Sequence, residues 1–211
     1  PEPLPSNLVE LCEAVVANGA DFGVSVDPDV DRLALICENG QPFGEEYTLV
    51  SVADYLLSRI YNEALETGKS IEEIAAPYQM VTSSNLSSSR ALRDVTEQYG
   101  GEYCTAAVGE VNVTTKMREA GALIGGEGNG GVIYPASHYG RDALVGIALF
   151  LTVVTLGAAA PAAACTLTAV GMSIGASYAV ASTAATVAVV ATTVAAAAYA
   201  GDIAYSAVTG D

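Results

Sequence analysis

An acidic hexapeptide, Asp27-Pro28-Asp29-Val30-Asp31-Arg32, lies between two short apolar runs of the chain. The runs on either side, 22–26 and 32–37, have the length and composition of short strands. Carboxylates on alternate residues of an extended loop point the same way, and they repel one another unless a cation lies between them. The pattern therefore predicts a magnesium site, and Arg32 adds the bidentate grip that suits a phosphoryl group.

Three other interpretations of the hexapeptide stay open. Aspartate and proline also crowd into ordinary solvated turns, and this chain is acidic throughout. The spacing imitates a calcium-binding loop with Glu38 at its twelfth position, but Arg32 stands where that loop needs glycine, and a strand-like run follows it. A magnesium phosphatase of the haloacid dehalogenase type would use Asp27 or Asp29 as its nucleophile, although the residues that follow them depart from that motif.

Composition limits the classes of partner and the compartment. The chain has 211 residues, of which 51% are hydrophobic, so it can bury a substantial core. Its formal net charge of −16 argues against a nucleic-acid partner. The four cysteines form no CxxC pair and the chain has a single histidine, His138. We therefore expect neither a zinc site nor a disulfide framework, and a reducing cytoplasm fits best.

The hydrophobic periodicity predicts alternating helices and strands, as in α/β proteins. Ser87 or Ser88 is expected to cap the helix that begins at residue 90. Helices are expected at 8–16, 50–64, 90–99, 113–120 and 142–156, and further strands at 21–26, 80–82, 103–108, 122–124 and 132–134.

A glycine-rich segment at 125–131 is the second candidate for chemistry. Its glycines let the backbone approach a ligand closely, while Glu127 and Asn129 offer polar groups that can bind sugar hydroxyls. A flexible hairpin whose glycines adopt positive φ is the competing interpretation. The segment lacks the Lys-Ser/Thr pair of a P-loop, which argues against nucleotide binding.

The composition changes after Asp142, because residues 143–201 contain no charged residue. Their length permits two membrane spans, at 143–160 and 180–200. The low transfer energy of alanine and threonine, and the absence of an aromatic belt, disfavour insertion. A helix at 142–156 that closes the α/β domain is the other interpretation, followed by an apolar, helical tail at 157–211 that can self-associate.

Six segments carry a family resemblance when they are taken together: 27–32, 44–47, 87–92, 108–113, 126–131 and 138–144. In order and spacing they resemble the second and third domains of the α-D-phosphohexomutases, the family of phosphoglucomutase, phosphomannomutase and phosphoglucosamine mutase. The resemblance covers roughly residues 1–155. It implies an α/β fold with a mixed sheet and flanking helices, divided into the end of domain two (1–44), domain three (45–156) and the apolar tail (157–211).

The resemblance also implies a metal and a role for each residue of the acidic loop. In that family the loop binds Mg²⁺ beside a phosphoserine. Asp27, Asp29 and Asp31 are thereby implied as metal ligands, and Arg32 as a catalytic contact to the phosphoryl group.

The resemblance implies sugar contacts in two further segments. Glu127 and Asn129 match the loop that binds the hexose phosphate, although the family commonly has serine at the position of Asn129 and histidine at that of Gly131. Gly109 and Glu110 resemble the loop that helps to choose between sugar orientations.

The implied activity is that of an isomerase, which moves phosphate within a hexose through a bisphosphorylated intermediate. No segment of the chain matches the phosphoserine loop of the family's first domain or the phosphate-binding loop of its fourth. We therefore expect no turnover from this chain alone. The alternative function is a membrane-tethered module whose acidic α/β part displays a sugar-phosphate or metal site.

Overall fold

The computed structural model describes residues 2–157. The tail predicted at 157–211 lies outside them apart from its first residue, as does the expected span at 180–200. The elements are, in chain order, η1 (Pro5–Asn7), α1 (Val9–Asn18), β1 (Phe22–Val26), β2 (Leu33–Cys37), α2 (Glu45–Thr67), α3 (Ile71–Ala75), β3 (Gln79–Asn85), α4 (Ala91–Gln98), β4 (Glu102–Ala106), α5 (Glu110–Ala120), β5 (Ala122–Glu127), β6 (Gly131–Ile133) and α6 (Ala143–Gly157).

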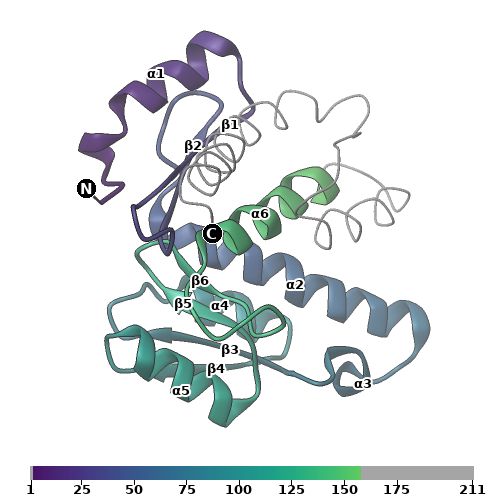
Figure 1. Ribbon diagram of the computed structural model, residues 1–211. Helices are drawn as coiled ribbons and strands as arrows, with labels where there is room; N and C mark the ends of the chain where they lie inside the picture. The colour runs from purple at the N-terminus through teal and green to yellow at the C-terminus, as the bar shows by residue number, and fades with distance from the viewer. Residues whose placement is uncertain (1, 158–211) are drawn as a thin grey trace, which may run out of the picture.

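The antiparallel hairpin of β1 and β2 lies between α1 on one side and α2 with α6 on the other (Figure 1). Successive side chains of a strand point to opposite faces. Leu33 and Leu35 accordingly join the core formed with α2, whereas Ala34 and Ile36 join the core formed with α1. Both faces of β2 are buried, which explains why its sequence is a continuous apolar run.

The second sheet is mixed, with the strand order β4-β3-β5-β6. Strands β4, β3 and β5 run parallel, and β6 turns back antiparallel to β5, with Gly126 opposite Val132. Helix α5 covers one face through Val113 and Met117, while α2 and α4 cover the other (Figure 1). The carboxyl ends of the three parallel strands therefore meet at one edge, where ligands bind in open α/β sheets.

The expected fold class is confirmed for residues 2–157, because a mixed sheet with flanking helices is present. Helix α2 begins at Glu45, five residues before the first position that its apolar periodicity indicated. Its first turn carries Glu45 and Glu46, whose charges favour a helix amino terminus. Helix α3 was not expected, although Ser70 and Glu73 form the reciprocal capping box that marks a helix start.

Helix α6 occupies the predicted helix at 142–156 and packs along α2 (Figure 1). The Phe150 ring makes edge-on contacts with Phe22 and Phe43, at centroid distances of 5.7 and 5.5 Å. Within residues 2–157 no helix has both the length and the apolarity to cross a bilayer. The part of the predicted span at 143–160 that is described is thus a helix packed on the α/β core.

Candidate functional site

The acidic loop joins β1 to β2 and is organised around Asp27. That residue is buried, and its Oδ1 accepts hydrogen bonds from the backbone N–H groups of Asp31 and Arg32, at 3.0 and 3.1 Å. These bonds fold the loop back so that Asp27 and Asp31 come together. Asp29, the middle carboxylate of the predicted trio, is exposed.

Val30 adopts a left-handed conformation, with φ of 57°. That conformation is costly for a β-branched residue, and such outliers persist only where the surroundings fix them. The Val30 N–H donates to the Asp27 carbonyl at 3.0 Å, and the Val30 carbonyl accepts from the N–H of Ala143 at 2.9 Å. The first residue of α6 therefore holds the acidic loop in its strained shape.

Burial and mutual contact shift the pKa values of the two neighbouring aspartates in opposite directions. Burial, together with the adjacent Asp27 carboxylate, raises the pKa of the Asp31 carboxyl, and the nearby Arg141 only partly offsets this. Burial also acts against ionisation of Asp27, but bonds from the Arg32 N–H and from Asp31 outweigh it and lower the pKa of Asp27. Asp27 therefore loses its proton at a lower pH than Asp31 does.

Arg32 lies beside this pair. Its Nη1 bonds to Glu2, and its Nε lies 3.7 Å from Asp27 Oδ2 and 3.9 Å from Asp31 Oδ1. The guanidinium is partly exposed, so it can reach a ligand at the loop.

The glycine-rich segment is more regular than its sequence suggests. Residues 125–127 belong to β5 and 131–133 to β6, which leaves a turn at 128–130. At Gly130 φ is +85°, and a Cβ there would overlap the Leu33 carbonyl, because the Leu33 N–H donates to the Gly130 carbonyl at 3.2 Å. Glycine at 130 therefore lets this turn lie directly against the acidic loop. Asn129 Oδ1 accepts a bond from the Gly131 N–H of the same turn.

Glu127, at the carboxyl end of β5, is 5% exposed and fully engaged inside the protein. Its Oε1 accepts from Asn85 Nδ2 at 2.6 Å and from the Gly109 N–H at 3.3 Å, and its Oε2 accepts from Arg141 Nη1 at 2.6 Å. Glu110, the first residue of α5, accepts from the Arg141 N–H at 3.0 Å. The structure thus brings Gly109, Glu110 and Glu127 into one cluster.

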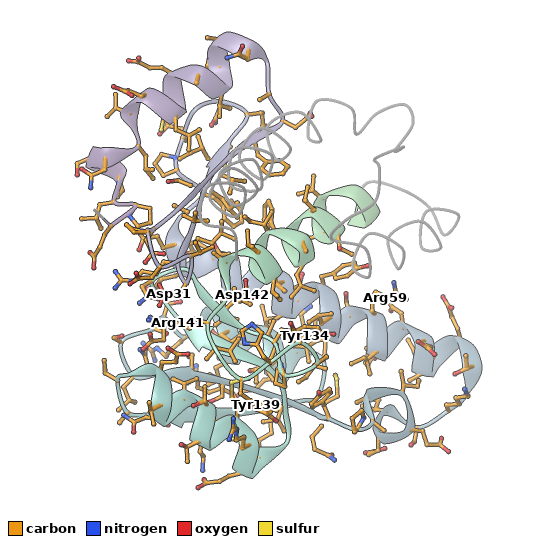
Figure 2. The ribbon with its side chains drawn as sticks, viewed as in Figure 1. Asp31, Arg59, Tyr134, Tyr139, Arg141 and Asp142 are labelled. Atoms are coloured by element: carbon orange, nitrogen blue, oxygen red, sulfur yellow. The ribbon has the colours of Figure 1, made fainter. Side chains whose placement is uncertain are left out.

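Two members of this cluster were missed by sequence reasoning. Arg141 binds Glu127 and also Asp31, which is 110 positions earlier in the chain, and Figure 2 shows it at the junction of the two parts of the molecule. Asn85 ends β3 and holds Glu127. An arginine just before a helix and an asparagine at the end of a strand were the available signals, and both are weak.

The expectation that Ser87 or Ser88 caps α4 was wrong. Their hydroxyls donate to Asn85 Oδ1, at 2.8 and 2.9 Å, and helix α4 begins only at Ala91. The serines instead fix the orientation of Asn85, and Ser88 Oγ accepts the Gly128 N–H at 2.9 Å. Through these bonds they support the glycine turn.

The acidic loop fits a hard cation in one specific respect. Asp31 Oδ1 is buried and has no hydrogen-bond partner, while Oδ2 of the same carboxylate is bound by Arg141. Burying a carboxylate oxygen without a hydrogen-bond donor costs free energy. Carboxylate oxygens are ligands that Mg²⁺ prefers, so a bound cation would offset this cost. Within residues 2–157, no three histidine, cysteine, aspartate or glutamate side chains form a ready-made cluster, consistent with the exposure of Asp29.

Two stretches of the sequence match models of known protein families. Residues 53–169 match the model described as phosphoglucomutase/phosphomannomutase, alpha/beta/alpha domain III, and residues 1–40 match that of alpha/beta/alpha domain II. The first match alone covers more than half of the chain.

Similar proteins have related names. A phosphoglucomutase/phosphomannomutase of Thermococcus kodakarensis is 37% identical over 142 residues, which are 67% of this chain and 27% of that protein. A probable phosphoglucosamine mutase of Methanopyrus kandleri is 32% identical over 142 residues, covering 67% of this chain and 28% of that protein. The chain thus spans less than a third of the length of these two relatives.

Solved structures show the same fold. A putative phosphomannomutase from Thermus thermophilus superposes with a TM-score of 0.60 at 23% identity, covering 74% of this chain and 32% of that one. A phosphoglucomutase/phosphomannomutase family protein from Burkholderia thailandensis gives a TM-score of 0.58 at 26% identity, covering 79% of this chain and 32% of that one.

Proposed function

This chain belongs to the phosphoglucomutase/phosphomannomutase family, and on that premise we propose that it supplies the metal-binding and sugar-binding parts of a phosphohexomutase. We place the end of domain two at residues 1–44 and domain three at 45–156. The family matches to 1–40 and 53–169 support this division, and the second match extends past residue 156, into the segment that composition assigned to the tail.

We propose Mg²⁺ as the cofactor, held by Asp27, Asp29 and Asp31. The observation that carries this proposal is the buried, unpartnered Oδ1 of Asp31 beside the buried carboxylate of Asp27. When bound, the cation would offset negative charge on a phosphoryl group in transfer. Arg32, which is partly exposed beside the same carboxylates, would hold that group by a bidentate contact.

The substrate that we propose is a hexose phosphate, namely a glucose, mannose or glucosamine phosphate. The names of the relatives support this class of substrate. Glu127, Asn129, Gly109 and Glu110 would form its contacts, because they lie at the carboxyl edge of the sheet, close to the acidic loop. The reaction would be an intramolecular phosphotransfer in a reducing cytoplasm, and the unpaired Cys12, Cys37 and Cys104 are compatible with that compartment.

Magnesium binding tests the metal part of this proposal. We expect the 211-residue polypeptide to give a calorimetric binding signal with Mg²⁺. A hundredfold excess over Kd should stabilise the fold by about 2.7 kcal/mol. Asp31→Asn should abolish both effects. Asp94→Asn is the matched control, since Asp94 is exposed and pairs only with Arg93 among the described ion pairs. A wild-type chain that shows neither heat nor stabilisation contradicts the metal assignment.

Turnover is a separate test. The polypeptide alone is expected to give no conversion of glucose 1-phosphate to glucose 6-phosphate, because no segment of its sequence matches the phosphoserine loop of the family. Detectable conversion by the purified polypeptide would contradict this expectation.

A further inference from the structure

Arg141 lies next to Asp31 (Figure 2), and it bonds to one carboxylate in each of three segments of the chain. Its Nη2 binds Asp31 in the acidic loop, and its Nη1 binds Glu127 at 2.6 Å. Its Nε lies 3.5 Å from Glu110 Oε2. The Arg141 side chain is 14% exposed, so these contacts are largely shielded from water.

The surroundings of Arg141 are shaped to hold it in this place. The residue forms an isolated bridge with Ile133, and the next N–H, that of Asp142, donates to the Val132 carbonyl at 2.9 Å. A Cβ added at Gly131 would lie 2.5 Å from Arg141 Cδ. The absence of a side chain at 131 therefore gives the arginine stem its path past β6.

The two ends of the guanidinium act on different parts of the candidate site. One NH₂ group holds Asp31 by Oδ2, which leaves the buried Oδ1 as the oxygen without a partner. The other holds Glu127 by Oε2. Arginine presents these donors in a rigid planar fork, so the positions of Asp31 and Glu127 depend on each other.

We propose that Arg141 is a positioning residue that couples the metal loop to the sugar loop, so that the geometry of Asp31 as a metal ligand depends on the bond between Arg141 and Glu127. This inference rests on the proposed function, because it takes Asp31 to bind the metal. Groups that orient a ligating carboxylate affect metal affinity strongly, and their loss commonly weakens binding about 10- to 100-fold.

The first test keeps the charge and removes the fork. Arg141→Lys retains a cation but offers a single ammonium in place of two parallel donor groups. Mn²⁺ alone is the probe, and its free concentration is read from its electron paramagnetic resonance signal. We expect Arg141→Lys to raise the Mn²⁺ Kd by about tenfold. Arg93→Lys is the matched control, because Arg93 pairs with Asp94 and Glu97 on the surface of α4, and its Kd should equal that of the wild type.

The second test asks whether Glu127 acts through Arg141. Glu127→Gln is measured in the wild-type and in the Arg141→Lys background. If each charge acts only through its field, the two effects on log Kd add. We expect the two effects not to add. Glu127→Gln should raise the Mn²⁺ Kd by roughly threefold or more in the wild type, and by less than about half of that factor in the Arg141→Lys background.

The outcomes separate this inference from the proposal beneath it. A wild-type chain that binds no Mn²⁺ overturns both. Normal Mn²⁺ binding by the wild type, with an equal Kd for Arg141→Lys or with additive effects in the cycle, overturns the coupling and leaves the metal site standing. Circular dichroism and thermal melting of each variant accompany the titrations. A purely structural arginine would lower the melting temperature without changing the Kd of the folded protein.

Discussion

Glu127 and Asp31 both bind the Arg141 guanidinium, but they differ in how many of their oxygens have a hydrogen-bond donor. Glu127 receives donors from Asn85, Gly109 and Arg141, so both of its oxygens are engaged within the protein. Asp31 receives a donor from Arg141 on one oxygen, while the other is buried without a hydrogen-bond partner. Glu127 is thus held by donors of the protein itself, whereas Asp31 keeps one oxygen for the cation that we propose.

The two residues should therefore contribute differently to the free energy of unfolding. A fully bonded buried charge stabilises the fold in which it lies, and its removal leaves donors without an acceptor. A buried oxygen without a donor destabilises the fold, and proteins retain such groups where function requires them. Substitutions at Gly130, Glu127 and Asp31 should therefore lower stability by amounts that decrease in that order.

Gly130→Ala should have the largest effect, because it should push the turn at 128–130 away from the acidic loop. Its Cβ would overlap the Leu33 carbonyl, and its φ is positive. We expect a loss of about 3 kcal/mol in the free energy of unfolding, measured by urea denaturation. Gly100→Ala is the matched control, since φ there is +76° with nothing within 4 Å of the added Cβ. Equal losses in the two variants would show that the close approach at Gly130 contributes nothing.

Glu127→Gln should destabilise the fold, because both oxygens of Glu127 accept hydrogen bonds. Glutamine has one acceptor oxygen, so its amide N–H groups would face a donor, either Asn85 or Arg141. We expect the free energy of unfolding to fall by about 2 kcal/mol, also by urea denaturation. Glu119→Gln is the control on the exposed face of α5, and it should change stability by less than about 0.5 kcal/mol. A loss at Glu127 as small as at Glu119 is the contrary result.

Asp31→Asn, measured without metal, should change the stability of the fold much less than Glu127→Gln does. Because burial and Asp27 raise the pKa of Asp31, the folded state disfavours its ionised form at neutral pH. The substitution removes that cost but replaces the charge-assisted bond to Arg141 by a weaker neutral one, so we expect urea denaturation to show a change within about 0.5 kcal/mol at neutral pH. A loss as large as that of Glu127→Gln would remove the contrast.

The pH dependence of Asp31→Asn has a defined sign. A carboxyl with a raised pKa costs stability above that pKa, and the cost vanishes once the group is protonated in both states. The variant should therefore lose stability relative to the wild type as the pH falls through the raised pKa of Asp31 toward the ordinary aspartate value, and the difference should level off below it. Thermal melts from about pH 7 to about pH 3 measure this, and a relative gain at low pH would contradict it.

Local pattern predicted most of the fold. Helices α1, α5 and α6 and strands β1 and β2 appear close to their expected bounds, because each buries an apolar run or stripe. The misses have local causes. The first turn of α2 carries charges rather than apolar residues, and in the glycine-rich segment Gly125, Gly126 and Gly131 form strand where the composition indicated loop. Backbone pairing between β5 and β6 overrode the weak intrinsic preference of glycine.

The candidate site was predictable only in its parts. Asp27, Asp31 and Glu127 stood out because carboxylates in loops after apolar runs are conspicuous. The link between them did not, because Arg141 reaches Asp31 across 110 positions and through a contact that no spacing encodes. Hydrogen bonds from Asn85 and Gly109 to Glu127 are likewise set by the parallel register of the sheet.

Helix α6 connects the acidic loop mechanically to a distant part of the core. Its first N–H donates to the Val30 carbonyl, and about two turns further along, Phe150 packs between Phe22 and Phe43. A shift of α6 along its axis would therefore displace Val30, which lies between Asp29 and Asp31. The same helix thus contacts both ends of β1, through the Val30 carbonyl beside the acidic loop and through Phe22 at the start of the strand.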